Sequence, residues 1–277
     1  MKKILAATTA VGMMLSSTAA FAANCTNEVW TKINDRGKIV VGVKADTKPW
    51  GFLNSDGKLV GMEADMAQEV ADTLGVELEL VGVQSSNRMQ FLEQGKIDLM
   101  IATMSDRKDR REIVGVVLPN YYTSGTNIMA PKALEFKDWA QLKDKPVCGK
   151  QGAFYNKIVE ERYGAQIVAF TGNAEAKQAL RDKKCVAWVF DDSSIAADLA
   201  SGEYGDYEMP LNTEDDNPWA LAVPIAEQSC VFGRFMSGMQ YEWLRSGKLL
   251  ELEKKWGIQE SAYLQNQKER FKDWLSE

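Results

Sequence analysis

Charged side chains follow the carboxyl ends of several hydrophobic, β-rich segments of the chain. Lys44 follows residues 39–43, a basic cluster at 107–111 follows residues 97–102, and Asp191 follows residues 186–190. A planar guanidinium can hold a carboxylate through two parallel hydrogen bonds, and a carboxylate at the end of a buried strand needs a partner or water. Because ligands of open α/β sheets bind beyond the carboxyl ends of strands, these positions are candidates for a small-molecule site.

The composition excludes several other kinds of site. The 277 residues include no histidine, which excludes Ser-His-Asp and Cys-His catalysis and histidine-ligated zinc. The formal net charge of −6 and the sequence pI of about 5.1 argue against broad binding to nucleic acid or anionic membranes. We expect a monomer without cofactor, metal or catalytic residues. We also expect a site of permanent charges that is insensitive to pH near neutrality.

The N-terminal segment has the features of a signal peptide. Two lysines precede a mostly apolar run from Ile4 to Leu15, and small residues flank Phe21. The run is too short to span a bilayer, which takes about 20 residues. We predict a signal peptide of residues 1–22 and an exported, periplasmic protein, although the leader alone does not distinguish periplasm from medium.

Predicted strands and helices alternate along the mature chain in two units. The first has strands at 39–43, 76–81 and 97–102 and helices at 62–74 and 89–94. The second has strands at 146–149, 166–170 and 186–190 and helices at 154–163, 174–182 and 194–200. Helices at 232–245 and 249–256 and a polar, helical tail from Gln259 complete the chain. This alternation is typical of an α/β fold with mainly parallel sheets, here in two lobes.

The four cysteines indicate disulfides, because an exported chain with an even count favours them over metal or thiol chemistry. Four cysteines allow three pairings, and sequence alone does not choose between them. Segments 125–130 and 219–223 are candidate crossovers between the lobes. Two crossovers put Cys25 and Cys230 in one lobe and Cys148 and Cys185 in the other, on strands that could be neighbours. We therefore favour Cys25–Cys230 and Cys148–Cys185, which would leave a hinge free to move.

Several segments resemble one known family. "VVGVKADTKPWGFLNSDGKLVGMEADMAQEVADTLGV" is similar to the opening of the bacterial extracellular solute-binding proteins of family 3, which are polar amino-acid receptors of ABC importers. "SSNRMQFLEQGKIDLMIATMSDRKDRREIV" resembles their next block. "CGKQGAFYNK", "CVAWVFDD" and "MQYEWLRSGKLLELEKKWG" resemble the loop of the second lobe, its ligand-binding strand and the C-terminal helix. The likeness covers nearly all of the mature chain, in order.

The resemblance implies a two-lobed periplasmic-binding-protein fold of type II, with two crossover strands as the hinge. Lobe 1 would comprise residues 23–127 and 222–277, and lobe 2 residues 128–221. The implied function is to capture a small amino acid by closure of the cleft and to present it to the membrane subunits of an ABC importer. Alternatives are a cyclohexadienyl-dehydratase-like enzyme, for which Glu63 and Asp65 are the early carboxylates, and a ligand-sensing partner of a membrane receptor.

The resemblance also assigns the groups that would hold an α-amino acid. Arg110 would clamp the α-carboxylate, with Thr103 and Ser105 donating hydroxyl or backbone hydrogen bonds. The basic residues Arg107, Lys108 and Arg111 are alternatives for the clamp. Asp191 would receive the α-ammonium group, and Asp192 is its rival.

Two further basic residues decide the expected ligand class. Arg88, in the segment Ser85-Ser86-Asn87-Arg88, and Lys44 stand where receptors for aspartate and glutamate carry basic groups. Three cations in one cleft would leave positive charge unpaired unless the ligand brings two carboxylates. We therefore predict an acidic L-amino acid, with a neutral polar amino acid as the alternative ligand.

The walls of the predicted cleft depart in part from the family pattern. Trp50 would flank the ligand, with packing in the core as the alternative, and Thr47 replaces an aromatic that is frequent in relatives. Gly152 would let the backbone of the lobe-two loop approach the ligand. The usual threonine of that loop is absent, and Phe154 or Tyr155 would narrow the pocket instead.

Overall fold

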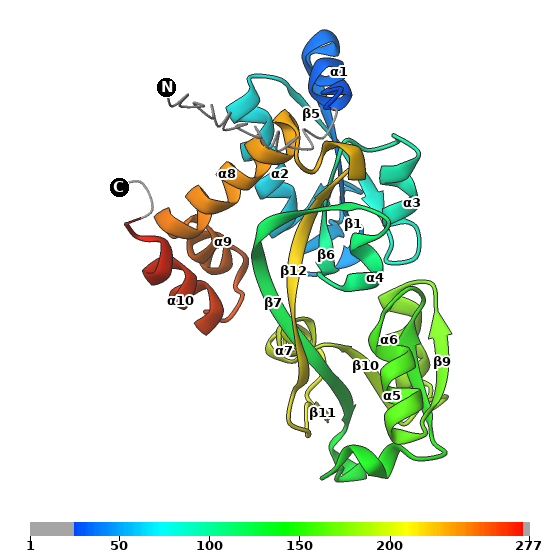
Figure 1. The fold of residues 1–277 in the computed structure, drawn as a ribbon. Helices are drawn as coiled ribbons and strands as arrows, with labels where there is room; N and C mark the ends of the chain where they lie inside the picture. Colours follow the sequence, from blue (N-terminus) through cyan, green and yellow to red (C-terminus); the bar gives the residue numbers. More distant parts are fainter. Residues whose placement is uncertain (1–24, 274–277) are drawn as a thin grey trace, which may run out of the picture.

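A computed structural model describes residues 25–273; the predicted signal peptide lies outside the described residues. The chain forms two lobes joined by two long strands, β7 (Gly115–Pro131) and β12 (Glu214–Val223) (Figure 1). Lobe 1 begins with α1 (Glu28–Arg36), β1 (Lys38–Lys44), β2 (Asp46–Thr47), β3 (Gly51–Leu53), β4 (Leu59–Val60) and α2 (Met62–Leu74). It continues with β5 (Glu77–Val83), α3 (Arg88–Glu93), β6 (Leu99–Ser105) and α4 (Lys108–Arg111).

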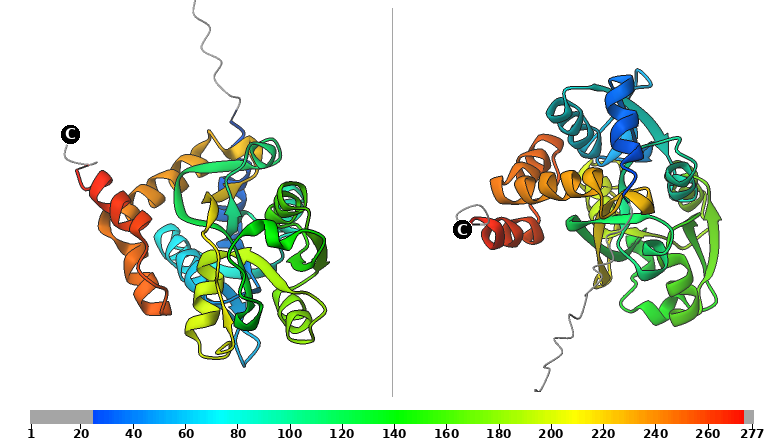
Figure 2. Two further views of the ribbon diagram at one scale, coloured as in Figure 1. Left: turned by 90° about the horizontal axis from the view of Figure 1, so that it is seen from below. Right: turned by 45° about the horizontal axis from the view of Figure 1, so that its top comes forward.

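Lobe 2 lies between the two long strands in the sequence. It contains η1 (Lys132–Leu134), η2 (Trp139–Leu142), β8 (Pro146–Lys150), α5 (Tyr155–Tyr163), β9 (Gln166–Phe170), α6 (Asn173–Arg181), β10 (Ala187–Asp191), α7 (Asp192–Ala200) and β11 (Tyr207–Glu208). After β12 the chain returns to lobe 1 with η3 (Ile225–Glu227), α8 (Val231–Ser246), α9 (Lys248–Trp256) and α10 (Ala262–Phe271). Figure 2 shows these C-terminal helices, in orange and red, on the opposite side of the molecule from α5 and α6 in green.

The local sequence explains why the predicted elements form. In α2, Met62, Met66 and Val70 are buried on one face, and the helix ends at Gly75, whose φ of 67° is a left-handed conformation that glycine adopts without strain. All seven residues of β6 are buried, which agrees with a continuous hydrophobic run in a parallel sheet covered on both faces. The predicted α/β alternation is therefore observed throughout both lobes.

The sheets of the two lobes are continuous through the long strands. The order β5-β1-β6-β12-β7-β10-β8-β9 forms the path of a nine-stranded sheet, with β11 added at β7. Pairs within the lobes, such as β1 with β5 and β8 with β10, are parallel, whereas β7 and β12 pair antiparallel to each other and to their neighbours. Both crossover strands are longer than the predicted segments 125–130 and 219–223.

The buried apolar residues divide by lobe. One core contains only residues between Ile128 and Leu211, while the other two draw on residues from Ile33 to Tyr122 and from Trp219 to Leu264. This division resembles the domain boundaries predicted from the sequence, which stay a prediction. The difference is at Trp219–Leu221, which pack into the cores of lobe 1 although we assigned them to lobe 2.

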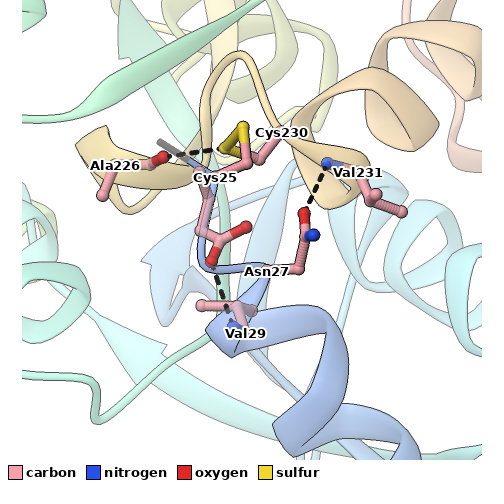
Figure 3. Close-up of a disulfide and its surroundings, with 7 residues drawn as sticks. Cys25, Asn27, Val29, Ala226, Cys230 and Val231 are labelled. Atoms are coloured by element: carbon pink, nitrogen blue, oxygen red, sulfur yellow. Dashed lines mark hydrogen bonds between the residues drawn. A yellow bond between two sulfur atoms is a disulfide. The ribbon is translucent and has the colours of Figure 1, made fainter. Parts of the chain in front are cut away.

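Both favoured disulfides are present. Cys148–Cys185 joins β8 to the segment before β10 inside lobe 2, and Cys25–Cys230 joins the start of the described chain to the N-terminus of α8. Around the second disulfide, Asn27 accepts a hydrogen bond from the amide of Val231 (Figure 3). Neither disulfide joins lobe 1 to lobe 2, so neither blocks movement between them.

Some elements were absent from the sequence prediction. These are α1, the small sheet β2-β3-β4, the one-turn helix α4, the short strand β11 and the 3₁₀ turns. Within residues 25–273, no helix is both long and apolar enough to cross a membrane.

Candidate functional site

Arg110 is the buried member of the basic cluster at 107–111. It lies on α4, directly after β6, and its guanidinium donates from Nη1 to the carbonyl of Ser105 at 3.0 Å. Burial, together with the positive charge of Arg88, lowers its pKa to about 9. Arg111 instead forms a bidentate ion pair with Asp106, and Arg107 lies over the ring of Phe154. Because Arg110 is the buried base of this cluster, the structure favours it over its neighbours as the candidate for the clamp, a role that stays a prediction.

Asp191 and Asp192 have different surroundings. Asp192 accepts hydrogen bonds from the Ser124 hydroxyl at 2.6 Å and from the amide of Gly125 at 3.0 Å, and so fixes the start of α7 to β7. Asp191, at the end of β10, is 6% exposed and has Arg88, Lys44 and Arg110 in electrostatic range. Asp192 is thus engaged in the hinge, and Asp191 is the acid that faces the basic groups of lobe 1.

Arg88 is held at the start of α3 by backbone carbonyls. Its Nη1 donates to the carbonyl oxygens of Ala102 and of Thr103, the latter at 3.0 Å. Its Nε is buried and has no hydrogen-bond partner among the described residues. Arg88 is 3% exposed and interacts electrostatically with Asp191 and Tyr155 of lobe 2, so its charge lies close to the junction of the lobes.

Lys44 belongs to a buried charge network that the sequence prediction did not include. Its Nζ donates to the Ser85 hydroxyl at 2.9 Å and lies 3.8 Å from Asp46. Asp46 in turn accepts from Nζ of Lys150 at 2.6 Å on each oxygen, and its Oδ2 accepts from the amide of Asn173 at 3.0 Å. Asp46 is in lobe 1, whereas Lys150 and Asn173 are in lobe 2. The network therefore links the lobes.

The pKa values in this network follow from burial and charge. Burial lowers the pKa of Lys44 well below its usual value, and the charge of Lys150 acts in the same direction while Asp46 opposes it. Burial acts to raise the pKa of Asp46, but the ammonium groups of Lys44 and Lys150 outweigh it and lower that pKa. Asp46 is thus a stable carboxylate shared by two lysines.

The loop of lobe 2 that contains Gly152 lies directly against lobe 1. Gly152 has a φ of +77°, and a Cβ at this position would lie 2.6 Å from the backbone nitrogen of Ser86. No other residue fits here without movement of the backbone. Phe154 follows, with the guanidinium carbon of Arg110 at 5.9 Å from its ring centre. Both residues therefore lie at the junction of the lobes, and their predicted contacts with a ligand stay predictions.

Trp50, Thr103 and Ser105 all make contacts inside lobe 1. Trp50 is fully buried in the core of lobe 1, with ring centres 4.4 Å from Tyr122 and 4.8 Å from Trp219, which favours the packing alternative. The amide of Thr103 donates to Glu63 at 2.7 Å, so only its hydroxyl remains for the predicted ligand contact. Ser105 contributes its carbonyl to Arg110, as described above.

Two carboxyl groups give the site a pH dependence that we did not expect. Burial raises the pKa of Asp191 to about 7, with the charge of Asp192 adding to the effect and the basic groups opposing it. Burial likewise raises the pKa of Glu63 to about 7. The expectation of a site insensitive to pH is wrong, because it considered only the ordinary pKa values of these side chains and not their desolvation.

The arrangement brings together, at the junction of the lobes, groups whose chemistry suits a small zwitterion. Arginine guanidinium groups suit carboxylates, and Asp191 suits an ammonium group. No group of three or more cysteine, aspartate or glutamate side chains within residues 25–273 could hold a metal ion. Asp46, Lys150 and Asn173 were missed because residues more than a hundred positions apart meet only in the folded chain. The one sequence feature that pointed to this network was a basic residue, Lys150, directly before the loop at residues 151–154.

Comparison with known proteins identifies the family. Residues 39–259 match the model of the bacterial extracellular solute-binding proteins, family 3. The chain belongs to this family. The solute-binding protein is 28% identical over 230 residues to the ABC transporter glutamine-binding protein GlnH of Bacillus subtilis (strain 168). The aligned residues cover 81% of this chain and 82% of that relative. The solute-binding protein is also 25% identical over 215 residues to the glutamate/aspartate import solute-binding protein of Escherichia coli (strain K12), or 73% of this chain and 70% of the relative.

Solved structures agree with the fold expected from the sequence. The solute-binding protein superposes on the P235GK mutant of ArgBP from T. maritima with a TM-score of 0.76 at 26% identity, over 82% of this chain and 98% of the other. A solute receptor for L-cysteine of Neisseria gonorrhoeae also gives a TM-score of 0.76, at 25% identity, over 82% of this chain and 92% of the other. The prediction of an α/β, two-lobed periplasmic-binding-protein fold is confirmed.

Proposed function

We propose that this solute-binding protein captures an acidic L-amino acid, aspartate or glutamate, in the periplasm and delivers it to the membrane subunits of an ABC importer. The names of the relatives support amino-acid import as the process. They do not agree on the ligand, because they include binding proteins for glutamine, for glutamate and aspartate, and for L-cystine. The ligand class therefore has to be argued from the site of this chain.

The observation that carries the proposal is the number of buried cations between the lobes. Four basic side chains are at most 5% exposed: Lys44, Arg88, Arg110 and Lys150. Asp46 neutralises Lys150 directly, and Asp191 is left to receive the α-ammonium group of the ligand. If Arg110 binds the α-carboxylate, Lys44 has among residues 25–273 only Asp46, at 3.8 Å, as an ion-pair partner, and it shares this carboxylate with Lys150. The hydrogen bonds of Arg88 go to backbone carbonyls. The buried Glu63 offsets part of their charge, but its Oε1 is hydrogen-bonded to Thr103 and Tyr121.

A second carboxylate on the ligand would supply a partner for Lys44 and Arg88. Each charge-assisted hydrogen bond contributes roughly 1.5–3 kcal/mol, and a ligand that lacks the group would leave a buried charge unpaired. Glutamine offers only a neutral amide oxygen to Lys44 and Arg88. This argument favours glutamate or aspartate over neutral amino acids.

Closure of the lobes would couple capture to delivery. Arg110, Arg88 and Lys44 belong to lobe 1 and Asp191 belongs to lobe 2, so one amino acid would bridge both lobes. A ligand that contacts both lobes shifts the population toward the closed form, because that form alone offers the full set of contacts. The importer would then recognise the closed form.

The proposal is tested by identifying the amino acid that co-purifies with the protein. The protein is purified without added ligand, mildly denatured, and the released small molecules are measured by mass spectrometry. We expect glutamate or aspartate at close to one equivalent. In Arg88→Met we expect less of either amino acid, because the substitution removes the proposed partner of the ligand's side-chain carboxylate. Glutamine, cystine or arginine as the released ligand would overturn the acidic assignment.

Two other functions make different predictions. An elimination enzyme would need a carboxylate placed for proton transfer, but Asp65 is bound to the Trp256 indole at 2.6 Å and Glu63 is hydrogen-bonded inside lobe 1. Formation of product from prephenate or arogenate would favour the enzyme. A ligand-sensing role would use the same closed form, and transport assays in a strain that lacks the protein would distinguish it from import.

A further inference from the structure

Glu63 connects the first turn of α2 to the end of β6. Its side chain is fully buried, and Oε1 accepts two hydrogen bonds, from the amide of Thr103 at 2.7 Å and from the Tyr121 hydroxyl at 2.6 Å. The Tyr121 oxygen also lies 3.1 Å from the Thr103 amide nitrogen. One carboxylate oxygen of Glu63 thus holds the backbone amide of Thr103 in place.

The amide that Glu63 holds belongs to a residue with an unusual backbone. Thr103 has a φ of +43°, in the left-handed region that β-branched residues rarely adopt. Such a conformation persists only where the surrounding structure holds it. The hydrogen bond from Thr103 to Glu63 is a contact of this kind, because it fixes the direction of the peptide between Ala102 and Thr103.

The same short segment holds Arg88. The carbonyl oxygens of Ala102 and Thr103 both accept from Nη1 of Arg88, and its buried Nε has no hydrogen-bond partner among residues 25–273. A rotation of the peptide between Ala102 and Thr103 would move the Ala102 carbonyl away from Arg88 and, through the shared Thr103 backbone, would also disturb the Thr103 carbonyl. Glu63 and Arg88 are therefore coupled through two backbone carbonyls.

We propose that Glu63 is a positioning residue for ligand binding, which holds the peptide between Ala102 and Thr103 so that the carbonyls of Ala102 and Thr103 direct the Arg88 guanidinium toward the ligand. The inference rests on the proposed role of Arg88 in binding the side-chain carboxylate of an acidic amino acid. It assigns Glu63 no contact with the ligand and no proton transfer.

The structure offers a matched control on the same helix turn. Asp65 is also an acid in the first turn of α2, but it accepts from the Trp256 indole at 2.6 Å and pairs with Lys255 at 2.7 Å. These partners belong to α9 and not to β6. Asp65→Asn should lower the melting temperature and leave ligand affinity within about twofold.

The test measures L-glutamate affinity by isothermal titration in a set of variants. Glu63→Ala removes the acceptor, and we expect affinity to fall about tenfold or more. Glu63→Gln retains an oxygen acceptor at the same place, so it should recover most of that affinity. Equal losses in Ala and Gln variants would overturn the inference, because they would show that charge and not acceptor geometry matters.

A double-mutant cycle with Arg88→Met separates positioning from a general structural effect. In the Arg88→Met background, Glu63→Ala should cause little further loss, since the residue through which it acts is gone. The same loss in both backgrounds would refute the coupling. If Glu63→Ala does not fold, Tyr121→Phe, which removes one donor to the same oxygen, is measured in both backgrounds and decides by the same criterion.

The two proposals fail in different ways. If the unmodified protein binds glutamine, arginine or cystine and not glutamate, the acidic assignment fails. The cycle is then measured with that amino acid, and its coupling still decides whether Glu63 acts through Arg88. If glutamate binds and no coupling is found, only the role of Glu63 is overturned.

Discussion

Replacement of Lys150 by methionine tests whether the lobes are held together by charge at the cleft. Lys150 is fully buried in lobe 2, and its Nζ lies 2.6 Å from both oxygens of Asp46 in lobe 1. Methionine has a similar length and removes only the charge and its hydrogen bonds. Because this contact joins the lobes, its loss should weaken the closed form and not the folding of either lobe.

The free-energy cost of Lys150→Met depends on the partners that Asp46 retains. Removing one partner of a buried ion pair costs about 3–5 kcal/mol when the other charge is left alone. Asp46 retains Lys44 at 3.8 Å and the amide of Asn173 at 3.0 Å, so we take a smaller value of about 2 kcal/mol. If this cost falls on the closed form, apparent ligand affinity should decrease about 30-fold.

The assay compares Lys150→Met with a matched pair inside one lobe. Lys177 contacts both oxygens of Asp198 at 2.9 Å, and both residues belong to lobe 2. Lys177→Met should lower the melting temperature with little effect on affinity for L-glutamate. Lys150→Met should weaken that affinity with little effect on the melting temperature. Unchanged affinity in Lys150→Met, or a loss equal to that in Lys177→Met, would refute a role for the pair in closure.

Three other predictions concern the clamp, the titrating acids and a disulfide. Arg110→Lys should weaken binding about tenfold or more by titration calorimetry, because an ammonium group cannot make two parallel hydrogen bonds to the α-carboxylate; an unchanged affinity would remove Arg110 from the site. The pKa values of Asp191 and Glu63 are raised to about 7 in the folded protein, so the folded state binds more protons than the unfolded state above about pH 4. Their contribution to stability should therefore decrease as pH rises from about 4 to 7, which chemical denaturation measures. Ligand affinity should increase over pH 6 to 8 as Asp191 ionises, which calorimetric titration measures. A stability that rises or an affinity that falls over these ranges would contradict the raised pKa values. Replacing Cys148 and Cys185 by alanine opens a loop with a sequence separation of 37 and should cost at most about 4 kcal/mol of unfolding free energy, and calorimetry showing no fall in melting temperature would count against a stabilising role.

The regular elements of this fold were predictable where the sequence pattern is strong. Helix α2 has buried residues at four-residue spacing and a terminal glycine, and both boundaries agree with the prediction. The strand β7 was predicted as a short segment because residues 115–124 contain Pro119 and polar side chains, which weaken the strand pattern. Its length comes from pairing with β12, which the local sequence does not encode.

The candidate site was predictable only in part, for a similar reason. Arg110 and Asp191 follow hydrophobic strands, so the pattern indicates their place in the fold. Asp46 and Lys150 are separated by 104 positions, and nothing in either neighbourhood indicates that they form an ion pair. The raised pKa of Asp191 likewise depends on burial by distant residues, which residue type alone does not reveal.

Direct comparison of amino acids as ligands tests the proposed function most sharply. Protein freed of bound ligand is titrated at pH 7.5 with L-glutamate, L-aspartate, L-glutamine and L-arginine under identical salt conditions. If buried Lys44 and Arg88 bind a second carboxylate, as proposed, glutamate or aspartate should bind about tenfold or more tighter than glutamine, and arginine should not bind measurably. Tighter binding of glutamine or arginine than of both acidic amino acids would contradict the proposed specificity.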